Sequence, residues 1–528
     1  MSRSVSVYDA TLRDGAQAEG ISFSVEDKLK ITKALDDLGL GYIEAGNPGS
    51  NPKDLEFFRC VKRLAPRAKI AAFGSTRRKD APVEEDKNAL ALLAADTDVV
   101  TFFGKCWDFH VTEILQASLG ENLKMIRDTA AFFKRNHKEV IFDAEHFFDG
   151  YKANPDYALS CLAAAAEAGA DCLALCDTNG GAFPLEIYEI TQKITAAFDI
   201  PIGIHCHNDC GMAAANSVMA VEAGASQVQG TFTGFGERCG NAALSTVIPN
   251  LQIKKSMPCI PPDRLPLLTR TARLISEVAN VRLNGSAPYV GRSAFAHKGG
   301  MHIDAVLKSS LSFEHIDPHR VGNARKILTS EMAGRGAVLA KIQKINPVLI
   351  KNSPETEAII RRVKELEHEG YQFEAAEGAL DIIIRKQLGR YKPLFELVNL
   401  KILGEQPYAE GQSAAAIIKI IVDGQVEITA AEGDGPVNAL DKALRKALEV
   451  FYPRIADMRL TDYKVRVMDE KSGTASRVRV LIESTDGNES WTTVGVSADI
   501  VEASWIALVD SVELKLLRDI ENGAEQFH

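Results

Sequence analysis

The chain has 528 residues, of which 46% are hydrophobic and 25% are charged. This length exceeds the size at which a single hydrophobic core usually stops growing, so two or three domains are expected. The formal net charge is −10, from 61 Lys plus Arg against 71 Asp plus Glu. An acidic balance disfavours binding to nucleic acid or anionic lipid through overall charge, and we expect neither as a partner.

The sequence lacks the usual signs of export or membrane insertion. No apolar run approaches the roughly 18 residues of a transmembrane helix, and the first residues lead into a strand pattern without an apolar signal segment. The nine cysteines lie mostly inside apolar runs, and their odd number suits reduced thiols better than a disulfide framework. We therefore expect a soluble, cytoplasmic protein.

From Val5 to about residue 255, short apolar runs rich in β-branched residues alternate with longer segments of helical periodicity. The first such helical segment opens at Ser24, has Asp27 at the capping-box position and closes at Gly39. Eight strand–helix units in succession predict an α/β fold, a closed (β/α)8 TIM barrel, with an open doubly wound sheet as the alternative. The candidate strands are VSVYDA, GYIEAG, KIAAFGS, VVTFFGK, EVIFDAEHF, CLALCDT, PIGIHCH and QVQGTFTGFG.

The alternation stops after residue 256, where the proline-rich run PCIPPDRLP marks a boundary. The sequence that follows indicates a helical arm around a Gly- and His-rich loop, SAFAHKGGMHIDAVL, and shows no strand pattern of its own. The last part repeats an order of strands followed by a helix. We predict a barrel in residues 1–260, helical linker subdomains in 261–392 and an α+β module of two βββα repeats in 393–528, suited to dimerisation or ligand sensing.

Barrel enzymes carry their chemistry at the carboxyl ends of the strands. In this chain, polar and ionisable residues are concentrated at those ends. They are Asp9, Arg13 and Asp14 at the end of the first strand, Glu44 at the end of the second, Asp143 and Glu145 at the fifth, Asp177 and Thr178 at the sixth, His205 and His207 at the seventh, and Glu237, Arg238 and Asn241 after the eighth.

His205 and His207 are the strongest candidates for metal ligands. Residues i and i+2 of a strand project to the same face, so both imidazoles can reach one point. In a closed barrel the eighth strand lies between the seventh and the first, so Asp14 and Asn241 approach that point from neighbouring loops. Two imidazoles, a carboxylate and an amide oxygen admit Zn²⁺, Mn²⁺, Co²⁺ or Mg²⁺. A pair of hydrogen-bonded core histidines is the alternative.

Arg13 stands next to Asp14 and would place a fixed positive charge beside the metal. A guanidinium and a metal ion can share the negative charge of a developing enolate or alkoxide. A salt bridge across the barrel mouth is the alternative role for Arg13.

Several sequence runs carry a resemblance to a known enzyme family: YDATLRDGAQAEG, YIEAGNPGSNPKD, AAFGSTRR, FGKCWDFHV, FDAEHFFDGYKANPDYA, LCDTNGG, IHCHND, GFGERCGNA and AFAHKGGMH. Together they resemble the metal-dependent barrel enzymes that condense an acyl-CoA with a 2-oxo acid, the 2-isopropylmalate, homocitrate and citramalate synthases. The runs GPVNALDKALRKALE and GTASRVRVLIES resemble the regulatory domain of the same family. Within it, GSNPKD, WDFHV and EHFFDGYKANPDYA are most similar to the branch that joins acetyl-CoA to pyruvate.

The resemblance implies roles for the residues at the barrel rim. Arg13 is implied to polarise the ketone of the 2-oxo acid and to stabilise the alkoxide, and Thr178 to hydrogen-bond the substrate carboxylate. The residues implied to hold a divalent metal ion are Asp14, His205 and His207, with Asn241 near it.

The resemblance also implies a base that removes a proton from the acetyl methyl group. This proton is too weakly acidic for water to remove at neutral pH. Glu145 of the barrel and His302 of the arm are implied to share this role. The arm would then complete an active site on the barrel of the other subunit. One position departs from the family: Phe313 stands where relatives usually carry tyrosine. Its missing hydroxyl removes any proton relay at that position.

The implied activity is a metal-dependent condensation of acetyl-CoA with pyruvate and water, giving citramalate and CoA. The implied setting is isoleucine biosynthesis, by a homodimer whose terminal module senses isoleucine. A 2-isopropylmalate or homocitrate synthase remains the alternative within the family. A carbon–carbon lyase is disfavoured by the long arm and terminal module, and an inactive binding protein by the complete set of rim residues.

Overall fold

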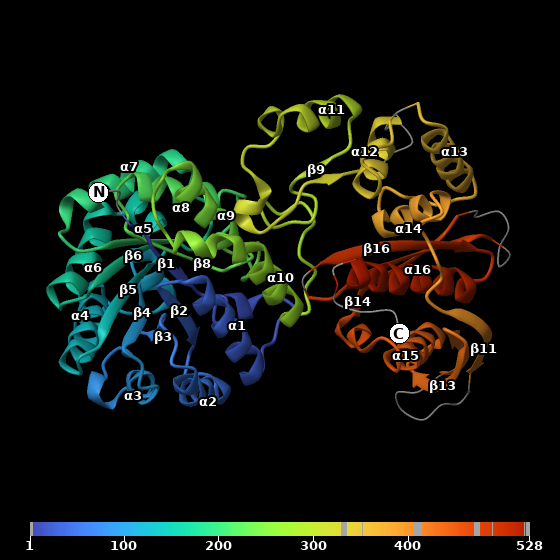
Figure 1. The fold of residues 1–528 in the computed structure, drawn as a ribbon. Coiled ribbons are helices and arrows are strands. Elements are labelled where there is room, and N and C mark those ends of the chain that lie inside the picture. The colour runs from blue at the N-terminus through green and yellow to red at the C-terminus, as the bar shows by residue number, and fades with distance from the viewer. Residues whose placement is uncertain are drawn as a thin grey trace. The chain divides into compact units, whose positions relative to one another are not determined.

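The computed structural model describes residues 4–328, 335–350, 352–404, 414–468, 476–487, 489–521 and 523. The chain divides into two compact units, residues 1–295 with 316–325 and residues 296–315 with 326–528 (Figure 1). Across the described segments, no helix is both long and apolar enough to cross a lipid bilayer.

The first unit is built on a closed barrel of eight strands in chain order. Every neighbouring pair is parallel, and β8 pairs with β1 to close the barrel. This closure confirms the predicted TIM barrel over the open sheet, and all eight predicted strands are present. They are β1 (Ser6–Asp9), β2 (Tyr42–Gly46), β3 (Lys69–Ser75), β4 (Val99–Lys105), β5 (Glu139–Glu145), β6 (Cys172–Asp177), β7 (Ile202–Cys206) and β8 (Gln227–Gly230).

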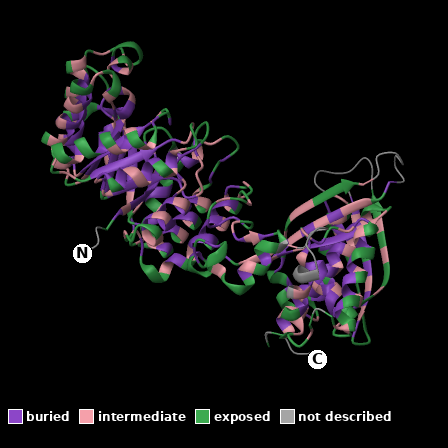
Figure 2. Cartoon of the chain, turned by 90° about the horizontal axis from the view of Figure 1, so that it is seen from above, coloured by how far each residue is buried: buried purple, intermediate pink, exposed green. Residues whose placement is uncertain are grey.

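Helices surround the barrel and bury their apolar sides against the strands (Figure 2). The first begins at Ser24, where the capping box with Asp27 forms, and ends at Gly39 with φ of +94°. The helices are α1 (Val25–Leu38), α2 (Pro52–Val61), α3 (Lys87–Ala94), α4 (Leu119–Arg135), α5 (Phe147–Ala153), α6 (Pro155–Glu167), α7 (Pro184–Ala197), α8 (Ala213–Glu222), α9 (Leu244–Pro249) and α10 (Leu268–Val278).

The interior of the barrel contains a layer of polar side chains. Tyr8 Oη donates to Glu44 Oε2 at 2.6 Å and lies 2.7 Å from Thr101 Oγ1. Nearby, Gln229 Nε2 donates to Asp143 Oδ1 at 3.0 Å. All five residues are buried, and buried polar groups persist because they are hydrogen-bonded. Two members of this layer also contact rim residues: Glu44 accepts from Arg13, and Gln229 lies within hydrogen-bond distance of His205.

The second unit begins with the arm. It contains a short parallel pair, β9 (Ala296–His297) with β10 (Lys326–Ile327). The sequence shows no strand pattern here, because a two-residue strand is too short to show periodicity. The arm helices are α11 (Gly300–Lys308), α12 (Arg335–Ile345), α13 (Pro354–His368) and α14 (Glu377–Gln387).

The terminal module has the predicted two βββα repeats, each with a three-stranded antiparallel sheet. The helix of each repeat packs on its own sheet, and the two helices also contact each other around one hydrophobic core. The first repeat is β11 (Glu396–Gly404), β12 (Ala414–Val422), β13 (Gln425–Gly433) and α15 (Pro436–Glu449). The second is β14 (Arg459–Val467), β15 (Val478–Thr485), β16 (Ser490–Ser497) and α16 (Ile500–Glu521).

Candidate active site

A tight turn after β1 brings two charged residues over the mouth of the barrel. The carbonyl oxygen of Ala10 accepts from the backbone N–H groups of Arg13, Asp14 and Gly15, at 2.9 to 3.2 Å. The turn is anchored from behind, because Asp9 accepts from both the backbone and the hydroxyl of Thr11. The backbone of Arg13 and Asp14 is thus held in one conformation directly after β1.

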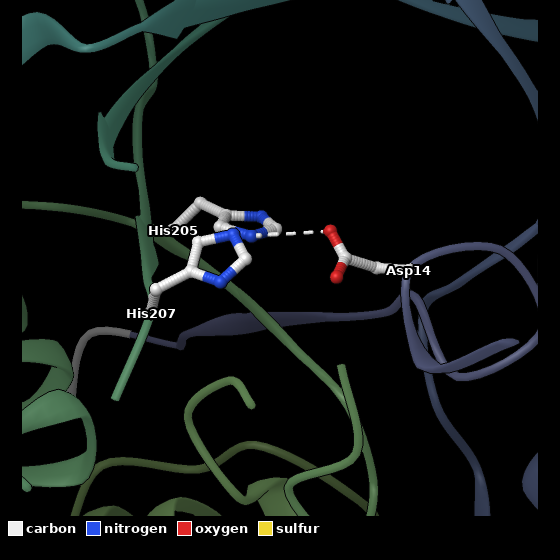
Figure 3. A group of neighbouring side chains, drawn as sticks. All are labelled: Asp14, His205 and His207. Atoms are coloured by element: carbon white, nitrogen blue, oxygen red, sulfur yellow. Dashed lines mark ion pairs between the residues drawn. The ribbon is translucent and has the colours of Figure 1, made fainter. Parts of the chain in front are cut away.

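Asp14, His205 and His207 form the one group of three or more potential metal-ligating side chains found in the described segments. One ligand atom from each lies within 4.8 Å of the others, and all three residues are buried. Figure 3 shows the two imidazoles side by side, facing the carboxylate. His205 Nε2 lies 3.7 Å from Asp14 Oδ2, and the two imidazole centroids are 5.4 Å apart. The two histidines of the run HCH therefore project to the same face of the seventh strand, as the alternation of side chains along a strand predicts.

Asn241 joins this group through its backbone and its side chain. It forms a bridge with His207, and its Nδ2 donates to Asp14 Oδ1 at 2.7 Å. Among the described residues, neither Asn241 Oδ1 nor His207 Nδ1 has a hydrogen-bond partner, although both atoms are buried. Buried polar atoms are normally satisfied, so two unsatisfied acceptor-capable atoms on residues of this group fit a bound cation.

The charges of this group suit a divalent metal. Burial alone would raise the pKa of Asp14, but Arg13 and the two imidazoles outweigh burial and lower this pKa to about 2. Burial and the neighbouring His205 lower the pKa of His207 to about 4. At neutral pH the group therefore offers a carboxylate and a neutral imidazole, the protonation states in which these side chains bind metals.

Arg13 is held on three sides. Its Nε donates to Glu44 Oε1 at 2.5 Å, and its Nη1 donates to Asp14 Oδ2 at 2.9 Å. Its guanidinium carbon lies 3.7 Å from the centroid of the Phe73 ring. Burial opposes the charge of Arg13, but Glu44 and Asp14 outweigh burial and raise its pKa. Arg13 is therefore a permanent, oriented cation beside the proposed ligands, and it also forms the salt bridges considered as its alternative role.

Glu145 and Thr178 lie at neighbouring strand ends. Glu145 Oε2 is 2.5 Å from Lys105 Nζ, at the end of β4. The next residue, His146, has a left-handed backbone with φ of +57°, and its N–H donates to Thr178 Oγ1 at 2.8 Å. The carbonyl oxygen of Thr178 accepts from Arg238 Nη2 at 2.7 Å. These hydrogen bonds link the loops that follow β5, β6 and β8.

The barrel unit thus contains Arg13, Asp14, Glu145, Thr178, His205, His207 and Asn241. His302 lies on α11 in the second unit, where its exposed ring stacks on Phe313 with centroids 4.1 Å apart. Phe313 therefore packs on the histidine implied to act as a base.

Two residues near the rim were missed in the sequence. Lys105 pairs with Glu145, and Gln229 contacts His205 from inside the barrel. Gln229 could have been found from QVQG, because alternation along a strand sends both glutamines of that run to one face. No pattern marks Lys105 as the partner of Glu145.

The cysteines near the cluster are not among its ligands. All nine cysteines of the chain lie in described segments and are free of disulfides. Cys206 is fully buried between the two histidines in sequence, and burial raises the pKa of its thiol. Cys210 is exposed. These positions agree with the structural role expected for both.

Three family models match successive parts of the chain. The HMGL-like model matches residues 4–274, the homocitrate synthase post-HMGL domain-like model 289–371, and the LeuA allosteric (dimerisation) domain model 374–516.

Among its relatives, the chain is 52% identical to an (R)-citramalate synthase of Aquifex aeolicus, covering 99% of this chain and 100% of that protein. It is 50% identical to the (R)-citramalate synthase of Geobacter sulfurreducens, covering 98% of each. The chain belongs to the citramalate synthase family. A third member, the (R)-citramalate synthase of Synechocystis, is 51% identical over 97% of this chain and 96% of its own length. Like its family, the chain is an acyl-transferring condensing enzyme with citramalate synthase function.

Gly236 provides a test of the metal site. Its φ is +154°, and a Cβ atom there would lie 2.2 Å from Asn241 Nδ2 and 3.1 Å from Asp14 Oδ1. We expect Gly236→Ala to displace both side chains and to weaken metal binding by about ten- to a hundredfold, the usual cost of disturbing the support of a ligand. Metal content after dialysis against Mn²⁺ measures the effect. Gly181→Ala, which enters open space, is the control. Wild-type metal content in Gly236→Ala would contradict the assignment.

Proposed function

We propose that the protein condenses acetyl-CoA with pyruvate and then hydrolyses the thioester, so that acetyl-CoA, pyruvate and water give citramalate and CoA. The R configuration in the names of its relatives is proposed for its product. The observation that carries the proposal is the buried cluster of Asp14, His205 and His207 beside the fixed cation Arg13, at the mouth of the barrel of a citramalate synthase family member.

Asp14, His205 and His207 would hold a divalent cation, with Asn241 Oδ1 as a further ligand. Zn²⁺, Mn²⁺, Co²⁺ and Mg²⁺ all accept this mixture of nitrogen and oxygen ligands. The bound cation would act as a Lewis acid toward the carboxylate and ketone oxygens of the 2-oxo acid. The unsatisfied atoms of His207 and Asn241 support this assignment.

Arg13 is suited to stabilise the alkoxide that forms at the former ketone carbon. Two of its nitrogens are occupied by Glu44 and Asp14, and no described residue hydrogen-bonds its third nitrogen, Nη2. A cation held on two edges needs no reorganisation when negative charge develops beside it. Thr178, fixed to the loop after β5 through His146, is the proposed donor to the substrate carboxylate.

Glu145 is the proposed base that removes a proton from the acetyl methyl group. The resulting enolate carbon attacks the ketone carbon of pyruvate, a carbon–carbon bond forms, and the ketone oxygen becomes the alkoxide. A positioned carboxylate contributes typically about a hundred- to ten-thousandfold to such a proton transfer.

Two aromatic rings next to Arg13 support pyruvate as the 2-oxo acid. Phe73 covers the guanidinium, and Phe103 stacks on Phe73 with ring centroids 5.6 Å apart. These rings come from adjacent strands, β3 and β4, and occupy the space beside the proposed alkoxide donor. A methyl group needs less of that space than the isopropyl group of 2-oxoisovalerate.

We further propose a homodimer regulated by isoleucine, in the biosynthesis of that amino acid. The match of residues 374–516 to an allosteric (dimerisation) domain supports a dimer and allosteric regulation, and isoleucine is proposed as the effector from the family resemblance. In this scheme residues 1–260 are the catalytic barrel, 261–392 are linker subdomains that complete the active site, and 393–528 are the regulatory dimerisation domain.

The choice of 2-oxo acid tests the proposed reaction directly. CoA release is measured in parallel with pyruvate, 2-oxoisovalerate and 2-oxoglutarate, in the presence of Mn²⁺. We expect pyruvate to be preferred in kcat/KM by at least about tenfold, the discrimination that a small difference in side-chain size can supply. A preference for either larger acid would instead indicate a 2-isopropylmalate or homocitrate synthase.

Variants of Glu145 and His302 test the base and its origin. We expect Glu145→Gln to lower kcat by about a hundred- to ten-thousandfold, because the neutral amide cannot accept the proton. Glu139→Gln, at the opposite end of the same strand, is the control and should retain activity.

Hybrid dimers of Glu145→Gln and His302→Ala, isolated with two affinity tags, test whether the arm serves the other subunit. If it does, each hybrid has one intact site and about half the wild-type activity. If each arm serves its own barrel, both sites of the hybrid are impaired and activity stays at the level of the single variants.

The terminal module is tested by inhibition. We expect isoleucine to lower the rate of CoA release by the full chain more strongly than leucine does. Removing residues 393–528 is expected to leave some turnover and to abolish this inhibition. Inhibition that survives the truncation would place the sensor outside the module.

A further inference from the structure

His205 makes a hydrogen bond on the side that faces away from Asp14. Its Nδ1 lies 3.0 Å from Oε1 of Gln229, a fully buried residue in the middle of β8. The other ring nitrogen, Nε2, lies 3.7 Å from Asp14 Oδ2. The ring therefore stands between an amide inside the barrel and the proposed metal position at its mouth.

The orientation of the Gln229 amide is fixed by two further contacts. Its Nε2 lies 3.0 Å from Asp143 Oδ1 and 3.2 Å from Gln227 Oε1. Both partners are oxygen acceptors when Asp143 is ionised, so the NH₂ group of Gln229 must face them. Its oxygen then faces His205, and an oxygen can only accept.

This orientation decides which tautomer His205 adopts. A neutral imidazole carries its proton on one nitrogen and a lone pair on the other. Because Gln229 presents an acceptor, the proton lies on Nδ1 and the lone pair on Nε2. That lone pair faces the carboxylate of Asp14, and two electron-rich groups at 3.7 Å are stabilised by a cation between them.

We propose that Gln229 is a positioning residue for the metal site: held by Asp143 and Gln227, it fixes His205 as the tautomer that offers Nε2 to the metal. This inference rests on the proposed metal site. It also gives the polar layer inside the barrel a role at the metal site, because that layer would fix the tautomer of His205 at the barrel mouth. His207 differs, because no described residue hydrogen-bonds its Nδ1.

The test measures metal affinity of the full-length protein by calorimetric titration with Mn²⁺, independently of turnover. Gln229→Met keeps the size of the side chain but removes the acceptor and the donor. We expect it to weaken Mn²⁺ binding by about ten- to a hundredfold, as is usual when the hydrogen-bond partner of a ligating histidine is lost. Thr101→Val is the matched control, because Thr101 is also a fully buried polar residue inside the barrel, its hydroxyl lies 2.7 Å from Tyr8 Oη, and among the described residues it shares no hydrogen bond with Gln229 or His205. We expect it to bind Mn²⁺ within about threefold of wild type.

The double variant Gln229→Glu with Asp143→Asn keeps an oxygen opposite His205 Nδ1, lets the new amide at position 143 donate to the new carboxylate, and guards against a misfolded methionine variant. We expect it to retain Mn²⁺ affinity within about fivefold of wild type, since carboxylates also orient ligating histidines. Wild-type affinity in Gln229→Met, or equal losses in Gln229→Met and Thr101→Val, would overturn the inference and reduce Gln229 to barrel packing. So would a loss in the double variant Gln229→Glu with Asp143→Asn as large as that in a folded Gln229→Met.

The wild-type protein and His205→Ala separate this inference from the metal site itself. If wild type binds one Mn²⁺ per chain and His205→Ala does not, the metal site stands whatever the Gln229 variants show. If both bind Mn²⁺ equally, the metal site is wrong, and the inference about Gln229 fails with it.

Discussion

The pairing of β8 with β1 is the constraint on which the proposed active site depends. It joins the two ends of the sheet, so that Asp14, just after β1, meets Asn241, 227 positions later in the chain. Because β7 is the other neighbour of β8, the two histidines come to the same place. An open sheet of the same strands would leave the carboxylate and the imidazoles at different positions along its edge. Closure of the barrel therefore converts three separate strand ends into one cluster.

Charge at the barrel mouth is balanced by close pairing. Arg13 lies between Glu44 and Asp14, both buried, and each of these carboxylates would be costly to bury without it. The same pairing keeps Asp14 ionised and holds the guanidinium in one orientation. A single arginine thus serves stability and the proposed chemistry. The acidic overall charge of the chain matters little here, because two anionic substrates would meet a local positive field.

The sequence predicts most of the barrel unit because its signals are local. Strand alternation places His205 and His207 on one face, and counting eight strands brings Asp14 and Asn241 near them. Alternation in QVQG is enough to place Gln229 on one face with Gln227, but no spacing encodes which atom of its amide faces His205. Lys105 was missed for a similar reason, since its partner belongs to another strand. The two-residue strands β9 and β10 fall below the length at which any period can be seen.

The hydrogen bond between Asn241 and Asp14 has a consequence for how a cation would enter and leave. It turns the amide nitrogen toward the carboxylate and leaves the amide oxygen without a hydrogen-bond partner among the described residues. One ligand atom each of Asp14, His205 and His207 already lies within 4.8 Å of the others before any ion arrives. Loading such a site requires little rearrangement of the chain, unlike small domains that fold only around their metal. Different divalent ions could therefore exchange on the intact protein, and the ion carried would follow supply in the surrounding medium as much as the preference of the ligands.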